Sequence, residues 1–376
     1  MLYSIIFSGR KRHMKVFTEE YNSIHPGYPI NELASPDKIL FIDIETTGLS
    51  RARSNLYLIG CGFFNDDGYN TIQWFAQSTD EESLIIKEFS TFIRDRFTLL
   101  MHYNGNHFDI PYLKFKCDSY GLADPFDGLD NYDIYCAVKP VKNILGLTSL
   151  RQRCVEQMLD INSEDPYTGR ELISVYHEYL RTHDEGNVAP LIYHNSEDLK
   201  GMAYILPILH YTSLSEAELI YVSHTIHDFQ DLKGDHCMEI LASYRHDLNI
   251  PKSITIRHDD IALSVRRDNT AVIRIPLTKG TLKYFYDDPG KYYYLPAEDC
   301  CILKEMATGV DRSRIEKAKK ETCYTKHSGL FIPAIIDHEI EFKTELTSKQ
   351  SYIPFNESDA QRLLDMIGRD ILRHTF

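Results

Sequence analysis

Two acidic residues end an apolar run near the start of the chain. The stretch Lys38–Ser50 reads KILFIDIETTGLS, and its carboxylates, Asp43 and Glu45, are two positions apart. Residues i and i+2 of a strand point to the same side, so a strand would project both carboxylates from one face. Two such carboxylates repel each other unless a cation lies between them. The pair indicates either a site for Mg²⁺ or Mn²⁺ or a strand with an acidic polar face.

Two further acidic residues could complete a metal site. Asp109 follows the predicted strand Thr98–Gly105 at the start of a helix, where the helix dipole favours a carboxylate. Asp198 lies on a predicted helix at residues 190–211, and His194, four residues earlier, shares its face. Each residue also has a simple structural explanation, because Asp109 could only cap its helix and Asp198 could lie on a solvated surface.

The elements that must position these residues are strands followed by helices. Three strands of an antiparallel meander are expected at residues 38–45, 55–66 and 70–78. Thr79 and Glu82 have the spacing of a capping box, so we expect a helix from there to about Arg96. The strand at residues 98–105 would then pair parallel to the first strand, across that helix. Two further helices are expected, at residues 147–159 and 171–181.

The ends of the chain have a different character. Residues 1–37 are expected to be a lead-in, with a short strand or helix at residues 2–7 and then a proline-containing linker. After Tyr211 we expect a helix within residues 228–250 and an antiparallel meander from about Ser253 to Leu295, in which residues 270–280 and 281–287 are separate strands. Residues 312–323 are expected to form a charged helix, and an amphipathic helix should follow Ser358.

The composition is that of a soluble globular protein with a net negative charge. Hydrophobic residues make up 43% of the 376, charged residues make up 26%, and the formal net charge is −14. This charge argues against a protein that binds nucleic acid non-specifically through a basic surface. An enzyme with this charge could still contact a few phosphates locally. The eight cysteines form no CxxC pair, and the N-terminus reverses the order of charged and apolar residues in a secretory signal. We therefore predict a cytoplasmic protein with no membrane segment.

Taken together, the three acidic stretches resemble a known enzyme superfamily. Asp43-x-Glu45, YNGNHFD ending at Asp109 and YHNSED ending at Asp198 are similar, in type and order, to the motifs of DEDD-type 3′–5′ exonucleases. That superfamily has the ribonuclease H-like fold. The middle motif most resembles the proofreading domains of family B DNA polymerases and the YprB-type ribonuclease H-like proteins, and the chain around it is similar to the YprB type. The resemblance covers about residues 38–211.

The resemblance implies a specific chemistry for these residues. Asp43, Glu45, Asp109 and Asp198 would hold two divalent cations, Mg²⁺ or Mn²⁺, and water would attack the phosphodiester bond in line. The superfamily orients this water with a Tyr four residues before the last Asp or a His five before it. This chain departs from both patterns, because His194 is four residues before Asp198 and Tyr193 is five before it. Helical geometry favours His194 as the general base, with Tyr193 as the alternative.

Several other residues are candidates for substrate binding. Thr46 and Leu49 would line the mouth of the site, and the family analogy makes Leu49 a wedge against the last base. Tyr103 and Asn104 could hold the terminal sugar or the next phosphate. Four basic residues are candidates for a phosphate track or are simply exposed charges: Lys139, Lys142, Arg151 and Arg153. Asp133 could be a second carboxylate behind the metal ligands or a strand-end residue. The aromatic residues at 284–286 and 292–294 could stack bases or form sheet core.

We therefore expect an α/β protein in which a ribonuclease H-like mixed sheet is flanked by helices. The expected domains are a lead-in (1–37), an exonuclease domain (38–212) and a smaller α+β domain with an antiparallel meander (213–376). The predicted function is metal-dependent 3′–5′ hydrolysis of single-stranded DNA or RNA. The alternatives are a ribonuclease H-like module that binds nucleic acid or a protein without cutting, and a structure-specific endonuclease on the same fold.

Overall fold

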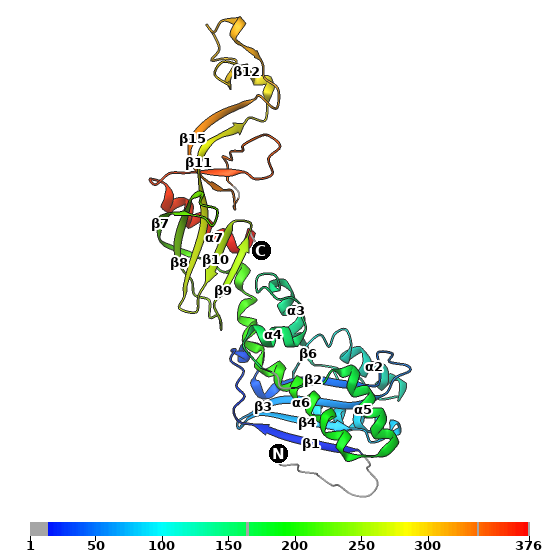
Figure 1. Ribbon diagram of the computed structural model, residues 1–376. Coiled ribbons are helices and arrows are strands. Elements are labelled where there is room, and N and C mark those ends of the chain that lie inside the picture. Colours follow the sequence, from blue (N-terminus) through cyan, green and yellow to red (C-terminus); the bar gives the residue numbers. More distant parts are fainter. Residues whose placement is uncertain (1–13, 163–164, 337, 375–376) are drawn as a thin grey trace. The chain divides into compact units, whose positions relative to one another are not determined.

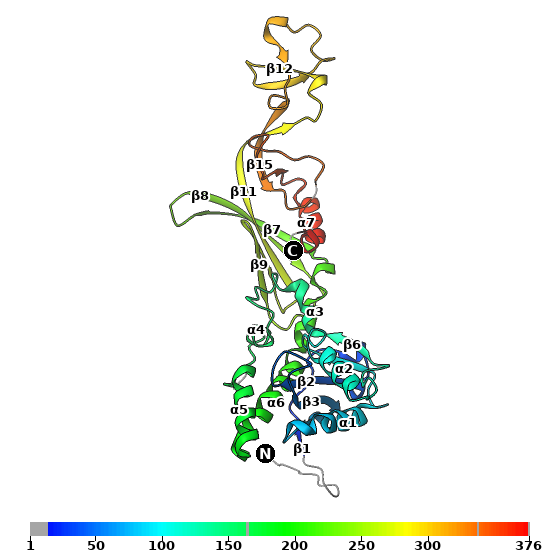
Figure 2. The same ribbon diagram turned by 90° about the vertical axis from the view of Figure 1, so that its right-hand side faces the viewer.

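The computed structural model describes residues 14–162, 165–336 and 338–374, which form two compact units. One unit ends at Thr212 and the other begins at Ser213. Figures 1 and 2 trace the chain from two directions, with colours that run from blue through cyan to green in the first unit and from green to red in the second. Each unit contains β-sheet of its own. None of the described helices is long and apolar enough to cross a membrane.

The first unit is built on a six-stranded mixed sheet with the strand order β1-β4-β3-β2-β5-β6. Its strands are β1 (Lys15–Tyr21), β2 (Ile39–Thr46), β3 (Leu56–Asn65), β4 (Gly68–Phe75), β5 (Leu99–His102) and β6 (Asp130–Asp133). The meander of β2, β3 and β4 is antiparallel and β5 is parallel to β2, as the sequence predicts. β1 pairs with β4, so a sheet strand lies where only a lead-in was expected. The element expected at residues 2–7 lies outside the described residues.

Helices cover both faces of this sheet. The helices of this unit are α1 (Glu82–Ile93), α2 (Asp109–Ser119), α3 (Ile134–Val138), α4 (Gln152–Met158), α5 (Gly169–Thr182) and α6 (Val188–Tyr204), of which α1, α2, α5 and α6 pack on the sheet. One apolar core joins the sheet to α1 and α2, and it includes Ile42 and Ile44 of β2. A second core joins β3 and β4 to α5 and α6. Because strand side chains alternate, Asp43 and Glu45 point to the other face of β2, which α6 covers. The predicted mixed α/β class is confirmed.

Three helix predictions in this unit need correction. The capping box of Thr79 and Glu82 is wrong, because Glu82 begins α1 and its carboxylate instead accepts a hydrogen bond from the N–H of Leu56, 2.6 Å away. The helix expected at residues 190–211 ends at Tyr204, and residues 206–211 form a 3₁₀ helix that includes Pro207. Proline cannot donate the next helical hydrogen bond. The helix expected at residues 147–159 is only α4, seven residues long.

The second unit is mostly antiparallel β-structure. Its larger sheet contains β7 (Ile220–Gln230), β8 (His236–Arg245), β9 (Ile254–His258), β10 (Ile261–Val265), β11 (Thr270–Phe285), β15 (Tyr324–Pro333) and β16 (Tyr352–Phe355). A small sheet contains β12 (Tyr292–Leu295), β13 (Cys300–Leu303) and β14 (Glu316–Lys317). The expected C-terminal amphipathic helix is present as α7 (Ala360–His374), with Leu364, Ile367 and Ile371 buried.

Two expected helices in this unit are absent from the described residues. Residues 228–250 contain the hairpin of β7 and β8, because Ile240, Ala242 and Tyr244 are buried in strand alternation and Gly234 adopts a positive φ in the turn. Residues 312–323 contain one 3₁₀ turn and the short β14, since the segment has no apolar face that a helix could bury. The two strands expected between residues 270 and 287 are the single strand β11.

The aromatic residues of this meander pack against one another. The rings of Tyr286 and Tyr292 stack with their centroids 4.5 Å apart, and Tyr284 meets Tyr286 edge to face at 5.0 Å. The ring of Phe285 contacts Tyr324 of β15 at 5.2 Å. These contacts favour the sheet-packing interpretation of the aromatic cluster over the base-stacking one.

Candidate active site

Asp43 and Glu45 project from the same face of β2, which is the face that α6 covers. The Nδ2 amide of Asn195 on α6 donates a hydrogen bond to Oδ2 of Asp43, 2.7 Å away. The Nε2 atom of His194, also on α6, lies 3.6 Å from Oε1 of Glu45. Because a β-bulge follows Glu45, the two carboxylates lie at the end of the regular part of the strand.

Asp109 begins α2, and its carboxylate points back to β2. Its Oδ1 atom accepts a hydrogen bond from the backbone N–H of Ile44, 3.2 Å away. The pairing of β2 with β5 ends at Phe41, which lies opposite Met101. The N–H of Ile44 lies beyond that end, and Asp109 supplies its hydrogen-bond acceptor. This contact ties the start of α2 to the strand that carries the first two acidic residues.

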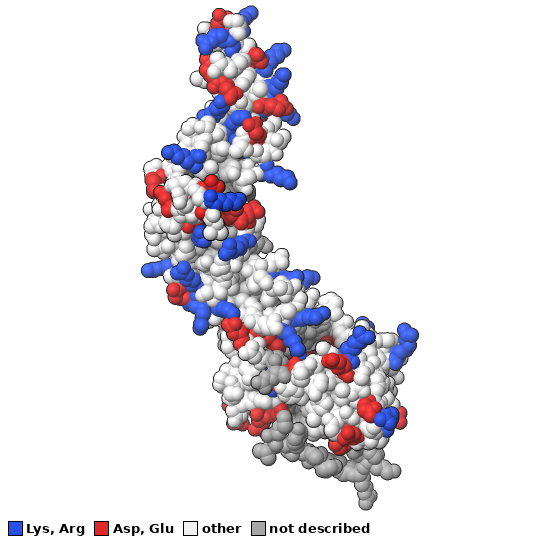
Figure 3. Space-filling view, viewed as in Figure 1, with Lys and Arg blue, Asp and Glu red and all other residues white. Residues whose placement is uncertain are grey.

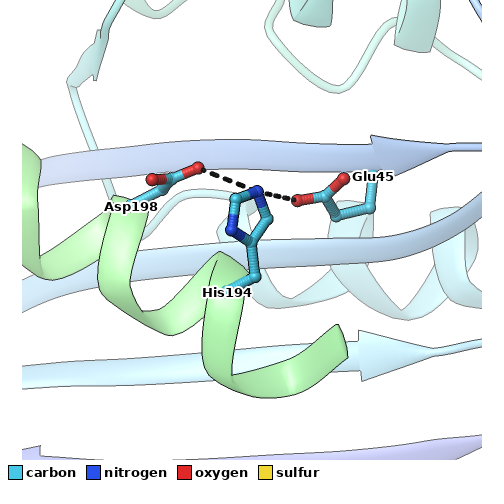
Figure 4. Close-up of side chains that lie close together, drawn as sticks. All are labelled: Glu45, His194 and Asp198. Atoms are coloured by element: carbon cyan, nitrogen blue, oxygen red, sulfur yellow. Dashed lines mark ion pairs between the residues drawn. The ribbon is translucent and has the colours of Figure 1, made fainter. Parts of the chain in front are cut away.

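The helix α6 brings the last acidic residue to the same place. His194 and Asp198 are one turn apart, and Nε2 of His194 lies 3.6 Å from Oδ2 of Asp198. Figure 4 shows the imidazole between the carboxylates of Asp198 and Glu45. One ligand atom from each of these three residues lies within 4.8 Å of the other two. The three sequence motifs therefore meet in space.

A glycine lets α6 approach β2 this closely. Gly60 on β3 pairs directly with Asp43, and a Cβ atom at Gly60 would lie 1.9 Å from Oδ1 of Asn195. Asn195 is fully buried, and Gln73 of β4 donates a hydrogen bond to its Oδ1 across 2.8 Å. Gln73 thus fixes the amide so that its Nδ2 faces Asp43. No sequence pattern had predicted a role for Gly60, Gln73 or Asn195.

The carboxylates at this site are electrostatically strained. Burial raises the pKa of Asp43 well above its usual value, and the charges of Asp198, Glu45 and Asp109 raise it further. Burial also raises the pKa of Glu45 to about 8, although His194 opposes this shift, and that of Asp109 to about 6. The pKa of Asp198 is raised by burial as well. For His194, burial opposes the charged form, but Asp198 and Glu45 outweigh it and raise the pKa.

This donor set fits divalent cations. Hard carboxylate oxygens are the preferred ligands of Mg²⁺ and Mn²⁺. Within the described part of the chain, no lysine or arginine forms an ion pair with any of the four carboxylates. Among the described residues, His194 offsets only part of the repulsion between these carboxylates, and a bound cation would relieve the rest. The residues that could hold it are Asp43, Glu45, Asp109 and Asp198.

Tyr193, the alternative base, lies on another side of α6. The Nζ atom of Lys200 lies 6.0 Å from the centroid of its ring and 5.0 Å from that of Tyr21 on β1. Tyr193 lines a cavity of about 1020 Å³ with residues of β1 and with Pro166. His194 faces the carboxylates instead, so the geometry favours His194 as the candidate base.

The predicted substrate-binding residues occupy varied positions. Leu49 is 86% exposed, beyond the end of β2, whereas Thr46 is buried and donates a hydrogen bond to the carbonyl of Gly48. The hydroxyl of Tyr103 donates to the carbonyl of Leu150, 2.8 Å away. Asn104 has a φ of 63°, and its N–H donates to Oδ1 of Asp133. Asp133 therefore shapes the loop that leads to Asp109.

The basic candidates differ in how freely they could meet a phosphate. Arg151 is exposed at the start of α4, and the next residue, Gln152, donates to the carbonyl of Asp198. Arg153 is already engaged, because its Nη2 atom lies 2.8 Å from Oδ2 of Asp165. On the face drawn in Figure 3, basic and acidic side chains are interspersed. A local contact from Arg151 fits this surface better than a broad basic track.

A further residue beside the site also had no predicted role. Asp165, which lies in the segment before α5, places its Oδ2 atom 2.6 Å from Nδ1 of His194. The two residues are 29 positions apart, and Asp165 belongs to no periodic element. Only the folded structure brings it behind the histidine.

Comparison with known proteins agrees with this architecture. Residues 40–209 match the model of the RNase_H superfamily, which is a little less than half of the chain. The first unit thus has a ribonuclease H-like fold, and the match suggests a nuclease. No curated protein sequence is significantly similar to this chain.

Among solved structures, the chain is similar to exonuclease I. The two are 11% identical, and the alignment covers 61% of this chain and 55% of exonuclease I, with a TM-score of 0.33. The chain thus spans about half the length of that protein. A likeness this distant carries no argument about function, which must come from the site itself.

Proposed function

We propose that this protein is a metal-dependent 3′–5′ exonuclease of the DEDD type, similar to the YprB-type proteins, acting on single-stranded DNA or RNA. The observation that carries the proposal is the convergence of four carboxylates from β2, α2 and α6 into one cluster with raised pKa values. The match of residues 40–209 to a ribonuclease H model supports it.

The proposed reaction is the attack of water on the last phosphodiester bond. The four carboxylates would hold two divalent cations, which supply positive charge to the reacting phosphate and make the attacking water more acidic. His194 accepts the proton of the water at Nε2. The oxygen of the water bonds to phosphorus, the bond from phosphorus to the 3′ oxygen breaks, and that oxygen takes up a proton. The products are a nucleoside 5′-monophosphate and a strand shortened by one nucleotide.

The other proposed contacts position the 3′ end. The exposed side chain of Leu49 is suited to pack against the terminal base, beside Thr46. Tyr103 and Asn104 would contact the terminal sugar or the following phosphate. Arg151 would contact the backbone phosphates further along the strand.

A single assay tests the proposal. The purified chain is incubated with 5′-labelled single-stranded DNA and RNA in Mn²⁺, in Mg²⁺ or in EDTA. We expect a ladder that shortens from the 3′ end, that needs the metal, and that Asp43→Asn abolishes. Asp118→Asn is the matched control, because Asp118 is an exposed acid on α2, and this variant should cut normally.

Two outcomes would point to the competing functions. Retention of the labelled strand without cleavage in any metal would favour a binding module. Cleavage of a circular single strand, which has no 3′ end, would favour an endonuclease. Either result would overturn the exonuclease proposal.

A further inference from the structure

A buried aspartate lies directly behind the proposed general base. The side chain of Asp165 is 1% exposed, and its Oδ2 atom is 2.6 Å from Nδ1 of His194. The other ring nitrogen, Nε2, lies 3.6 Å from both Glu45 and Asp198. The imidazole is therefore held between one carboxylate behind it and two in front of it.

The carboxylate of Asp165 is itself fixed from two other directions. The backbone N–H of Tyr167 donates to its Oδ1 atom across 3.0 Å. The guanidinium of Arg153 donates from Nη2 to its Oδ2 atom and to its backbone carbonyl, each across 2.8 Å. Arg153 and the N–H of Tyr167 can only donate, so both oxygens of Asp165 already act as acceptors, and Oδ2 has a second lone pair directed at His194.

This arrangement decides which ring nitrogen carries the proton. A neutral imidazole has one donor and one acceptor nitrogen, and the hydrogen bond made by one sets the role of the other. Because Asp165 accepts, Nδ1 must donate. The lone pair then resides on Nε2, the nitrogen that faces Glu45 and Asp198. The opposite tautomer would aim an N–H at the reacting water and could not take its proton.

We infer that Asp165 is a positioning residue of the reaction, which holds His194 in the tautomer and ring orientation that leave Nε2 free to accept a proton. This inference rests on the proposed function of His194, which it deepens. It also assigns a role to Arg153, which anchors Asp165 and is not a phosphate contact. The hydrogen-bond partner of a metal-bound histidine typically changes metal affinity or activity by about 10- to 100-fold, and we expect an effect of that size here.

The first test needs no variant and no nuclease activity. Nitrogen-15 NMR of the full chain, at a pH where His194 is neutral, reports which ring nitrogen is protonated, and His194→Gln assigns the signal. We expect the proton on Nδ1. In Asp165→Ala the ring should lose this preference and populate the Nε2–H tautomer. A wild-type signal with the proton on Nε2 would overturn the inference, whether or not the protein cuts nucleic acid.

The second test is kinetic. Asp165→Ala should lower kcat by about 10- to 100-fold while KM changes little, and Asp165→Glu should recover part of the loss. Asp184→Asn is the matched control. Oδ1 of Asp184, in the segment before α6, accepts a hydrogen bond from the N–H of Gly186 across 2.9 Å, just as Oδ1 of Asp165 accepts one from Tyr167. It should retain wild-type kcat. Equal losses in the Asp165→Ala and Asp184→Asn variants, or an unchanged kcat in Asp165→Ala, would contradict the inference.

Discussion

The substitution Glu45→Gln should stabilise the metal-free protein while it removes metal binding. The pKa of Glu45 is raised from 4.5 to about 8 in the folded chain, mainly by burial. The folded protein holds this proton more tightly than the unfolded chain does. Its stability is therefore highest below pH 4.5 and falls as the pH rises toward 8. Each pKa unit is equivalent to about 1.4 kcal/mol, so folding near pH 7.5 bears a cost of up to about 4 kcal/mol for this carboxylate.

The neutral amide that replaces the carboxylate avoids most of that cost. We expect Glu45→Gln to raise the free energy of unfolding by about 2–4 kcal/mol in EDTA near pH 7.5, where the lower value allows for the lost attraction to His194. The corresponding rise in Tm is about 5–15 °C for a unit of this size. Because Glu45 is protonated in both states near pH 4, the difference should disappear there.

Calorimetry of the full chain, with and without Mn²⁺, measures both effects. Mn²⁺ at about 100 times its Kd should stabilise the wild type by about 2.7 kcal/mol and the variant by much less. Glu20→Gln, which neutralises an exposed acid on β1, is the control and should change neither value. A variant that is less stable than the wild type in EDTA near pH 7.5 would mean that the protein itself compensates the charge. A bound cation would then not be needed to relieve the repulsion.

Three other expectations concern the same site. His194→Ala should lower kcat by about 10²- to 10⁴-fold and Tyr193→Phe should not, and an unchanged turnover in the histidine variant would exclude it as the base. Gly60→Ala places a Cβ 1.9 Å from Oδ1 of Asn195, so we expect a loss of about 1–3 kcal/mol in the free energy of unfolding and weaker Mn²⁺ binding. An unchanged Tm would show that α6 can move away without cost. Mn²⁺ affinity, measured by calorimetric titration, should fall from about pH 8 to pH 6 as Glu45 takes up a proton, and a pH-independent affinity would contradict its raised pKa.

The acidic residues of the site were predictable because each lies at a fixed place in a regular element. The i, i+2 spacing of Asp43 and Glu45 has a definite meaning in a strand, and the i, i+4 spacing of His194 and Asp198 has one in a helix. The predicted parallel pairing of β2 with β5 is confirmed, and Asp109 begins α2 as expected. Periodicity thus indicated which side chains share a face.

The residues that support the site were not predictable in this way. Asp165 reaches His194 from an irregular segment, and the role of Gly60 depends on how closely α6 packs against the face of the sheet to which a side chain at Gly60 would point. Both are matters of tertiary packing, which local spacing does not encode. The wrong helix at residues 228–250 has a different cause, because its apolar residues also fit the two-residue period of a strand and Gly234 marks a turn.

The long strand β11 gives the second unit an uneven resistance to local opening. Its first half, Thr270–Leu277, is bonded to β8 along one edge, and β10 covers part of the other edge. Its second half, from Thr278 to Phe285, has β15 along one edge and, among the described residues, a single bridge to Lys343 on the other. Amide hydrogens in the first half should therefore exchange with solvent more slowly, although the strand has no break. One continuous backbone would then pass from a rigid sheet into a more easily opened ribbon.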